Sequence, residues 1–254
     1  MNTSVPEHKP TNSDSPREPI FKNLPIGTIL ILLVIGAIFV ARIGEPEGGT
    51  YVWAANLQLI SQKIALYLTE GTGGTNELWT LISYQFLHAG RFHIVMNAAM
   101  LLQVGPICEI GFIPHANLNN YANMPRANFA QKLKMKAALL FILYFLACGI
   151  IAALGFVWLN SSSSIPLVGA SGSISGIFAG YLWSAFIMAP RGSQIVRPLA
   201  ESAIVFLVIN VGLAALVRGS NLIAIAWEAH LFGFLAGLVL YPLFYRLSRT
   251  GTMP

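Results

Sequence analysis

Long runs of apolar residues, separated by short polar connections, dominate the chain. Six runs approach the roughly 20 residues that cross a bilayer as a helix. They cover approximately residues 24–43, 86–108, 136–159, 170–189, 199–217 and 226–247. The runs are long and lack an alternation with period two, which favours helices over barrel strands. The pattern therefore predicts an all-α integral membrane protein with six transmembrane helices.

Polar segments at both ends set the domain boundaries. Residues 1–22 mix Pro, Ser, Thr, Asn and charged residues, which predicts a disordered tail. The first apolar run follows this polar segment and lacks an Ala-x-Ala cleavage site, so we interpret it as a retained helix. We expect one membrane domain over residues 23–248 and a short tail over 249–254.

The connection after the first run, residues 44–79, is long and only partly polar. Leu57, Ile60, Ile64 and Leu68 recur in it at helical spacing, with polar residues between them. This spacing predicts an amphipathic helix. The helix either lies in the membrane interface or packs on the external face of the protein. A second long connection, residues 109–135, is rich in Asn and is expected on the cytoplasmic side.

Composition agrees with a membrane protein, because 55% of the residues are hydrophobic and only 10% are charged. Soluble domains contain about a quarter charged residues. Lys and Arg concentrate before the first run, between the second and third, between the fourth and fifth, and after the sixth. By the positive-inside rule, both termini are expected in the cytoplasm. The net charge of +5 thus reflects topology, and no nucleic-acid partner is inferred from it.

Small residues recur every four positions in the fourth and sixth runs. The two sets are Gly172, Gly176 and Gly180, and Ala229, Gly233 and Gly237. Such faces let transmembrane helices pack closely, and packing alone would explain the glycines. Ser171 directly precedes the first set and His230 directly follows the first member of the second. Packing of the two faces would therefore bring this serine and this histidine together.

The second run carries two further polar residues at a similar depth. His93 and Asn97 are four residues apart, so they share a helix face, and both side chains can donate hydrogen bonds. His88 would lie about 140° away on the same helix and is not expected on that face. Polar pairs of this kind can also serve only to hold helices together.

Other hydrolytic chemistries lack their residues. The only aspartate is Asp14, no His-Glu-x-x-His stretch occurs, and no lysine lies in the interior of a run. Cys108 and Cys148 read as small apolar fillers, so neither metal nor cofactor is expected. Acyl transfer by Ser171 with His230 as base remains. Glu228 lies about 200° around the helix from His230, so a dyad without an acidic third member is expected.

Three motifs together resemble the rhomboid family of intramembrane serine proteases. They are His88-x4-His93-x3-Asn97, Gly169-x-Ser171-Gly172 and Ala229-His230-x2-Gly233. The resemblance implies a six-helix rhomboid-like bundle whose long first loop is partly embedded in the membrane. It implies that Ser171 is the nucleophile and His230 the base, and that His93 and Asn97 assist the oxyanion. His88, Gly169, Gly172 and Gly233 complete the structural motifs.

The same resemblance implies a substrate and a location. Single-span membrane proteins would be cut in or near their transmembrane segment and released outward. The fifth helix and the loop 218–226 would form a gate and a cap. The short six-helix layout suits a prokaryotic plasma membrane, and the oligomeric state stays open.

Two positions depart from the family pattern. Thr80 follows Trp79 where many members carry arginine, and Ser175 occupies a position that is often aromatic. The main alternative is a rhomboid-like protein that binds membrane clients without cutting them. A channel or transporter is disfavoured because no internal repeat is evident.

Overall fold

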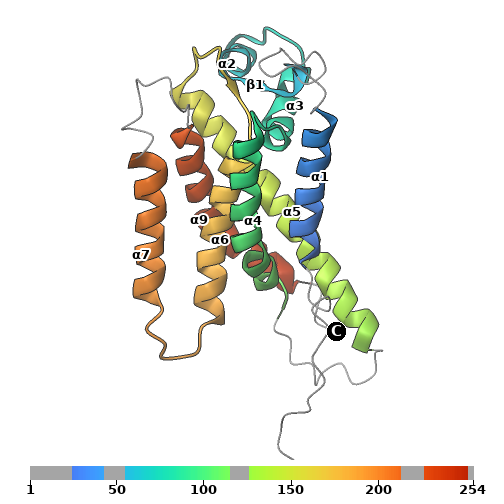
Figure 1. The fold of residues 1–254 in the computed structure, drawn as a ribbon, viewed down its shortest axis with the longest axis vertical. Coiled ribbons are helices and arrows are strands. Elements are labelled where there is room, and N and C mark those ends of the chain that lie inside the picture. Colours follow the sequence, from blue (N-terminus) through green and yellow to red (C-terminus); the bar gives the residue numbers. More distant parts are fainter. Residues whose placement is uncertain (1–24, 43–54, 115–125, 213–225, 251–254) are drawn as a thin grey trace, which may run out of the picture.

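The computed structural model describes residues 25–42, 55–114, 126–212 and 226–250, and helices make up most of it (Figure 1). The bundle contains α1 (Ile26–Ala41), α4 (Arg91–Gly111), α5 (Arg126–Leu159), α6 (Ser171–Met188), α7 (Val196–Leu207) and α9 (Trp227–Arg249). A π-helical turn, η5 (Val208–Gly212), continues α7. Two shorter helices, α2 (Ser61–Glu70) and α3 (Asn76–Ser83), lie together at one end of the bundle.

Within the described residues, four helices are long and apolar enough to cross a membrane. They are Arg91–Gly111, Gln131–Leu159 within α5, Ser171–Met188 and Trp227–Arg249. Helix α1 is apolar but shorter, at 16 residues, and α7 has 12 residues before its π turn. The protein is therefore a multi-pass membrane protein. The prediction of six spans stays a prediction, since the first and fifth are not established by length.

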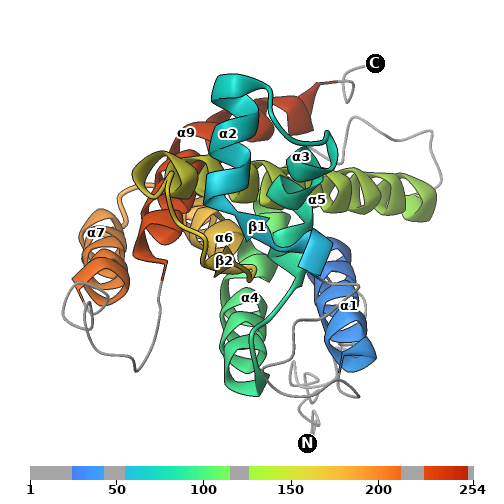
Figure 2. The same cartoon turned by 90° about the horizontal axis from the view of Figure 1, so that it is seen from above.

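Helix α6 occupies the centre of the bundle and packs against α4, α5 and α9 (Figures 1 and 2). Small residues let its neighbours approach closely: an added Cβ on Gly176 would lie 2.5 Å from Cys148 of α5 and 3.0 Å from the Gly233 carbonyl of α9. Tyr144 of α5 completes the contact, because its hydroxyl lies 2.9 Å from the carbonyl oxygens of Gly176 and Gly237. Helices α5, α6 and α9 are thus joined by close packing and by the buried Tyr144 hydroxyl.

Buried polar contacts hold the far end of the bundle. The Glu109 carboxylate, near the end of α4, accepts hydrogen bonds from the backbone N–H groups of Gly27 and Thr28 at 2.9 Å. These amides begin α1 and have no partner within their own helix, so the carboxylate caps it. Lys136 of α5 donates to the Ser248 carbonyl near the end of α9 at 3.0 Å. The start of α1 and the end of α9 therefore lie at the same end.

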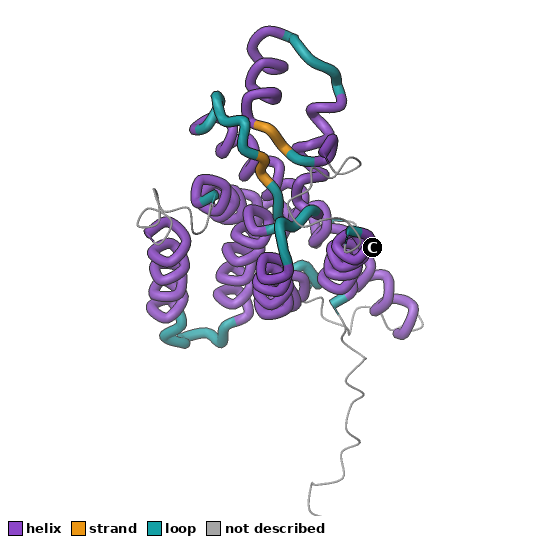
Figure 3. The backbone as a smooth tube through the Cα atoms, turned by 45° about the horizontal axis from the view of Figure 1, so that its top comes forward, coloured by secondary structure: helices purple, strands orange, loops and turns teal. Residues whose placement is uncertain are grey.

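At the opposite end, the first loop pairs with the segment that precedes α6. Strand β1 (Leu59–Ile60) runs antiparallel to β2 (Pro166–Leu167), with Leu59 opposite Leu167 (Figure 3). The Gln62 amide extends the contact by donating to the Ser163 carbonyl at 3.1 Å. The first loop is therefore hydrogen-bonded to the segment that directly precedes Ser171.

Several predicted boundaries were wrong. The second run is not helical from residue 86, because Tyr84–Phe86 forms a 3-10 turn, η3, and Gly90 is extended before α4 begins at Arg91. Helix α5 begins at Arg126, within the predicted connection 109–135. The predicted amphipathic helix exists as α2, but it begins at Ser61, because the preceding residues are used in β1. Helix α3 was not predicted. The tail 1–22 and loop residues 218–225 fall outside the described residues.

Candidate active site

Ser171 is the first residue of α6, and His230 is in the first turn of α9. The two helices meet where these residues lie. A Cβ added to Gly233 would overlap the Gly172 carbonyl oxygen, and one added to Gly172 would lie 3.4 Å from the Ala229 carbonyl oxygen. Gly172 directly follows Ser171, and Ala229 directly precedes His230. The backbone contact therefore brings the serine and the histidine to the same level at neighbouring helix starts.

The contact continues one turn further along both helices, and then the faces diverge. A Cβ on Gly237 would overlap the Gly176 carbonyl oxygen. Gly180, however, faces Cys108 of α4 and Tyr144 of α5, with an added Cβ at 2.5 Å and 3.1 Å from them. Eight residues rotate the helix by about 80° beyond two full turns. Gly180 therefore serves a different helix contact from Gly172 and Gly176, contrary to the single face that we expected.

His93 of α4 is the third group to reach this point. A Cβ added to Gly169 would lie 2.7 Å from His93 Nε2, so only glycine leaves room for the imidazole. Gly169 also has a φ of +120°, which side chains rarely adopt. His93 Nδ1 accepts a long hydrogen bond, 3.4 Å, from the Ala89 amide. That bond favours a neutral imidazole with its proton on Nε2, which faces the turn before Ser171.

Asn97 is turned toward its own helix. Its amide nitrogen donates to the His93 carbonyl oxygen at 2.9 Å, and the side chain is buried. One amide hydrogen is used in this bond and the second remains. The structure therefore places Asn97 directly below His93, and among the described residues no hydrogen bond joins it to Ser171.

His88 lies outside α4, in the connection before it, contrary to our prediction. Its ring contacts that of His93 edge to face, with the centroids 5.1 Å apart. Its carbonyl accepts a hydrogen bond from Arg42 at the end of α1, at 2.9 Å. Gly90, between the two histidines, has an extended backbone and precedes the first residue of α4. His88 thus packs behind His93 and links it to α1.

The start of α6 provides donors for a negative charge. Its N-cap residue, Ala170, offers no side-chain hydrogen bond, and the first intrahelical N–H to find a partner is that of Ile174, which donates to the Ala170 carbonyl. The preceding amides lack an intrahelical partner, as at every helix start, and the helix dipole adds to their attraction for an anion. An oxygen that becomes negative beside Ser171 would meet these N–H groups.

In the described part of the chain, no carboxylate is bonded to His230. Its Nδ1 is buried and has no hydrogen-bond partner there. Ser175, at the position where the family often has an aromatic residue, donates its hydroxyl to the Ser171 carbonyl at 2.8 Å. No group of three or more potential metal ligands occurs among the residues that the structure describes.

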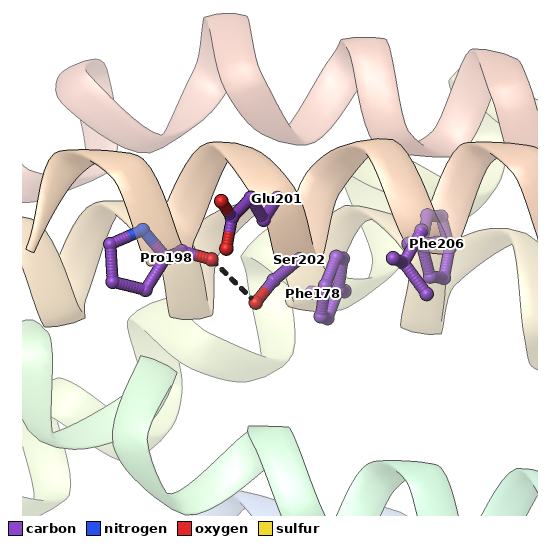
Figure 4. A pocket seen from close by; sticks show the side chains of 6 residues that line it. Phe178, Pro198, Glu201, Ser202 and Phe206 are labelled. Carbon is purple, nitrogen blue, oxygen red and sulfur yellow. Dashed lines mark hydrogen bonds between the residues drawn. The ribbon is translucent and has the colours of Figure 1, made fainter.

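A shallow groove lies farther along α6, on the side where α7 packs. It is lined by Phe178 of α6 and by Pro198, Glu201, Ser202, Val205 and Phe206 of α7 (Figure 4). The rings of Phe178 and Phe206 stack with their centroids 4.4 Å apart, and Phe206 also stacks on Phe234 of α9. These aromatic rings join α7 to α6 and α9. The groove does not include Ser171 or His230.

A family model of the rhomboid domain matches residues 75–247, which run from the start of α3 almost to the end of α9. The chain belongs to the rhomboid family. Rhomboid proteins are generally intramembrane serine proteases, which act on membrane-protein substrates within the bilayer. The resemblance noted in the sequence is thereby confirmed at the level of the family. A search of curated proteins finds no significant match.

Residues outside the rhomboid motifs also contact the segment around Ser171, and no motif in the sequence pointed to them. They are Tyr84 and Gln85 of η3, Gly149 of α5 and Ser173 of α6, all of which contact the turn that carries Ser171. The sequence feature that could have pointed to them is the presence of two polar residues, Gln85 and Ser173, next to or within apolar runs. Thr80, which replaces the frequent arginine, is buried in α3 and donates to the Glu77 carbonyl.

Proposed function

We propose that the protein is a rhomboid serine protease that uses a Ser171–His230 dyad. His230 accepts the proton of the Ser171 hydroxyl as the oxygen attacks a peptide carbonyl, and it then donates that proton to the leaving amine. Water, deprotonated by the same imidazole, hydrolyses the acyl-enzyme. The observation that supports the proposal is the backbone contact of Gly172 with both Ala229 and Gly233, because Ser171 and His230 are the chain neighbours of Gly172 and Ala229.

The negative oxygen formed in each step would be held by the free amides at the start of α6 and by His93. The Nε2–H tautomer of His93, supported by the Ala89 contact, supplies a donor on the correct side of Gly169. Asn97 would support His93 through its hydrogen bond to the His93 backbone carbonyl oxygen. Alternatively, after a side-chain rotation, Asn97 would donate its remaining amide hydrogen to the oxyanion. Losing one oxyanion donor costs on the order of 100-fold in rate.

We further propose that the substrates are single-span membrane proteins cut in or near their transmembrane segment. In this proposal α7 is the gate, held closed by the Phe178–Phe206 stack, and the protein crosses a prokaryotic plasma membrane six times. Both termini face the cytoplasm, which agrees with the start of α1 and the end of α9 lying at the same end of the bundle. The product would leave on the side of Ser171.

Labelling with a serine-reactive fluorophosphonate tests the dyad. Purified protein in mild detergent is compared with Ser171→Ala, His230→Ala and, as a control, Ser202→Ala on α7, where the side chain is exposed. We expect labelling of the wild type and of the control, and none of the two dyad variants. Labelling that survives Ser171→Ala would refute the assignment. A folded wild type that neither labels nor cuts a model transmembrane substrate in liposomes would favour the client-binding alternative.

A further inference from the structure

Two consecutive residues of η3 hold the chain on both sides of Ser171. The Tyr84 carbonyl oxygen accepts a hydrogen bond from the Gly169 amide at 2.9 Å. The Gln85 side-chain oxygen accepts one from the Ser173 hydroxyl at 2.8 Å. The bonded positions lie two residues before and two residues after the serine. We name this Tyr84–Gln85 pair the clamp.

The clamp is completely enclosed and its polar groups are paired. Gln85 and Ser173 are 0% exposed, and Tyr84 is 1% exposed. The Gln85 amide nitrogen donates to the Leu81 carbonyl at 3.1 Å, and the Tyr84 hydroxyl donates to the Gly149 carbonyl at 2.8 Å. In such an environment, a hydrogen bond that is lost on one side leaves a buried group unsatisfied, at a cost of about 1–3 kcal/mol.

Helix α5 is shaped to admit this arrangement. A Cβ on Gly149 would overlap both the Gln85 amide and the Ser173 hydroxyl. A hydrophobic side chain at residue 149 would occupy the space that the Gln85 amide and the Ser173 hydroxyl fill. The absence of a side chain here therefore makes room for a specific polar contact between η3 and α6.

We propose that Gln85 is a positioning residue, which acts through Ser173 to fix the turn that carries the nucleophile. This inference rests on the proposed function of Ser171. The turn has the left-handed Gly169 on one side and unpaired helix amides on the other, so it depends on outside contacts for its position. A displacement of about 1 Å in a catalytic group can cost on the order of 100-fold in rate.

Core packing alone is the competing explanation, and the chain provides a matched control for it. Ser184, on the last turns of α6, is also 0% exposed, and its hydroxyl is hydrogen-bonded to that of Tyr241 at 2.6 Å. Ser184→Ala removes a buried hydroxyl contact from the same helix, but 13 residues away from Ser171 (184 − 171 = 13). Both explanations predict a lower melting temperature for this variant, and neither predicts slower chemistry at Ser171.

The experiment measures the rate of fluorophosphonate labelling and the melting temperature of the full-length protein in detergent. The variants are Gln85→Met, Ser173→Ala, the double variant and Ser184→Ala. We expect Gln85→Met and Ser173→Ala to slow labelling by about 10-fold or more. The double variant should be no slower than the slower single variant, because the two residues act through one bond. Ser184→Ala should label at the wild-type rate despite a similar loss of thermal stability.

Wild-type labelling rates in folded Gln85→Met and Ser173→Ala would overturn the proposal. If Gln85→Met does not fold, Ser173→Ala decides, because it removes only one oxygen. If the wild type neither labels nor cuts a model transmembrane substrate, the proposed function fails, and hydrogen–deuterium exchange over residues 168–174 tests the clamp separately. Faster exchange there in Ser173→Ala than in Ser184→Ala would support the clamp, and equal exchange would refute it.

Discussion

At the scale of single residues, Ser171 and His230 lie in the first turns of α6 and α9, each beside a small residue. These positions could be predicted from the sequence, and the catalytic roles of the two residues stay a proposal. His88 could not be placed, because its position depends on where α4 begins, and the extended residue that precedes α4, Gly90, lies inside the predicted run. The link between Gln85 and Ser173 could not be foreseen either, since it joins residues 88 positions apart.

The buried imidazole of His88 makes stability depend on pH. Burial, with smaller contributions from His93 and Arg42, lowers the pKa of His88 from its ordinary value of 6.5 to about 3. The unfolded chain therefore binds a proton at mildly acidic pH that the folded chain rejects. The contribution of His88 to stability is complete above about pH 6.5, decreases as the pH falls, and at about pH 5 is smaller by roughly 2 kcal/mol.

Melting temperatures at about pH 7.5 and pH 5 measure this effect, because these two pH values lie on either side of the ordinary pKa of histidine. His88→Gln, which cannot titrate, should lose less stability between the two conditions than the wild type does. The comparison uses the change with pH, so a uniform destabilisation by the substitution does not affect it. Equal changes in both proteins would show that His88 is not the group responsible.

At the scale of helices, close packing could be predicted wherever small residues recur, because backbone contact needs no knowledge of side-chain conformation. The α6–α9 pair is the clearest case. Helix α3 and the first ten residues of α5 could not be predicted as helices from long apolar runs, since α3 is only 8 residues long and the start of α5 is polar. Helix α3 packs against α5 in the folded protein.

Two glycine-to-alanine substitutions test the helix contact that forms the site. In Gly233→Ala, the new methyl would overlap the Gly172 carbonyl oxygen, which is backbone and cannot rotate away. We expect a loss of about 1–3 kcal/mol in stability and a large drop in labelling of Ser171. In Gly36→Ala on α1, an added Cβ meets nothing within 4 Å, so stability should stay the same or rise by up to about 1 kcal/mol.

Thermal unfolding in detergent measures the change in stability, and fluorophosphonate labelling measures the reactivity of Ser171. Both residues lie within helices, so both substitutions gain similar helix propensity, and the difference between them reports the contact alone. Equal melting temperatures for the two variants would contradict the close approach of α6 and α9. The placement of Ser171 beside His230 would then lose its main support.

At the scale of the whole molecule, the bundle has two chemically different ends. One end holds the Glu109 cap of α1 and the Lys136 contact with the end of α9. The other holds α2, α3, the β1–β2 pair and the starts of α6 and α9. The rhomboid match begins at residue 75, so α1 and α2 lie outside it. They are nevertheless joined to the family core by buried contacts, which no hydrophobicity pattern could reveal.

The orientation of these ends in the membrane can be measured with single cysteines. Cys108 and Cys148 are both 0% exposed, so they should not react with an impermeant maleimide in the folded protein. Thr72→Cys, between α2 and α3, and Lys132→Cys, on the first turns of α5, replace exposed residues at opposite ends of the bundle. By the positive-inside rule, Lys132 should face the cytoplasm and Thr72 the outside.

In right-side-out membrane vesicles we therefore expect immediate labelling of Thr72→Cys and labelling of Lys132→Cys only after the vesicles are opened. The unsubstituted protein is the control for the buried native thiols. Inverted vesicles should give the reverse order, which guards against a difference in intrinsic reactivity. The opposite result in both preparations would place Ser171 on the cytoplasmic side. Substrates would then be cut and released inward, and the proposed outward release would be wrong.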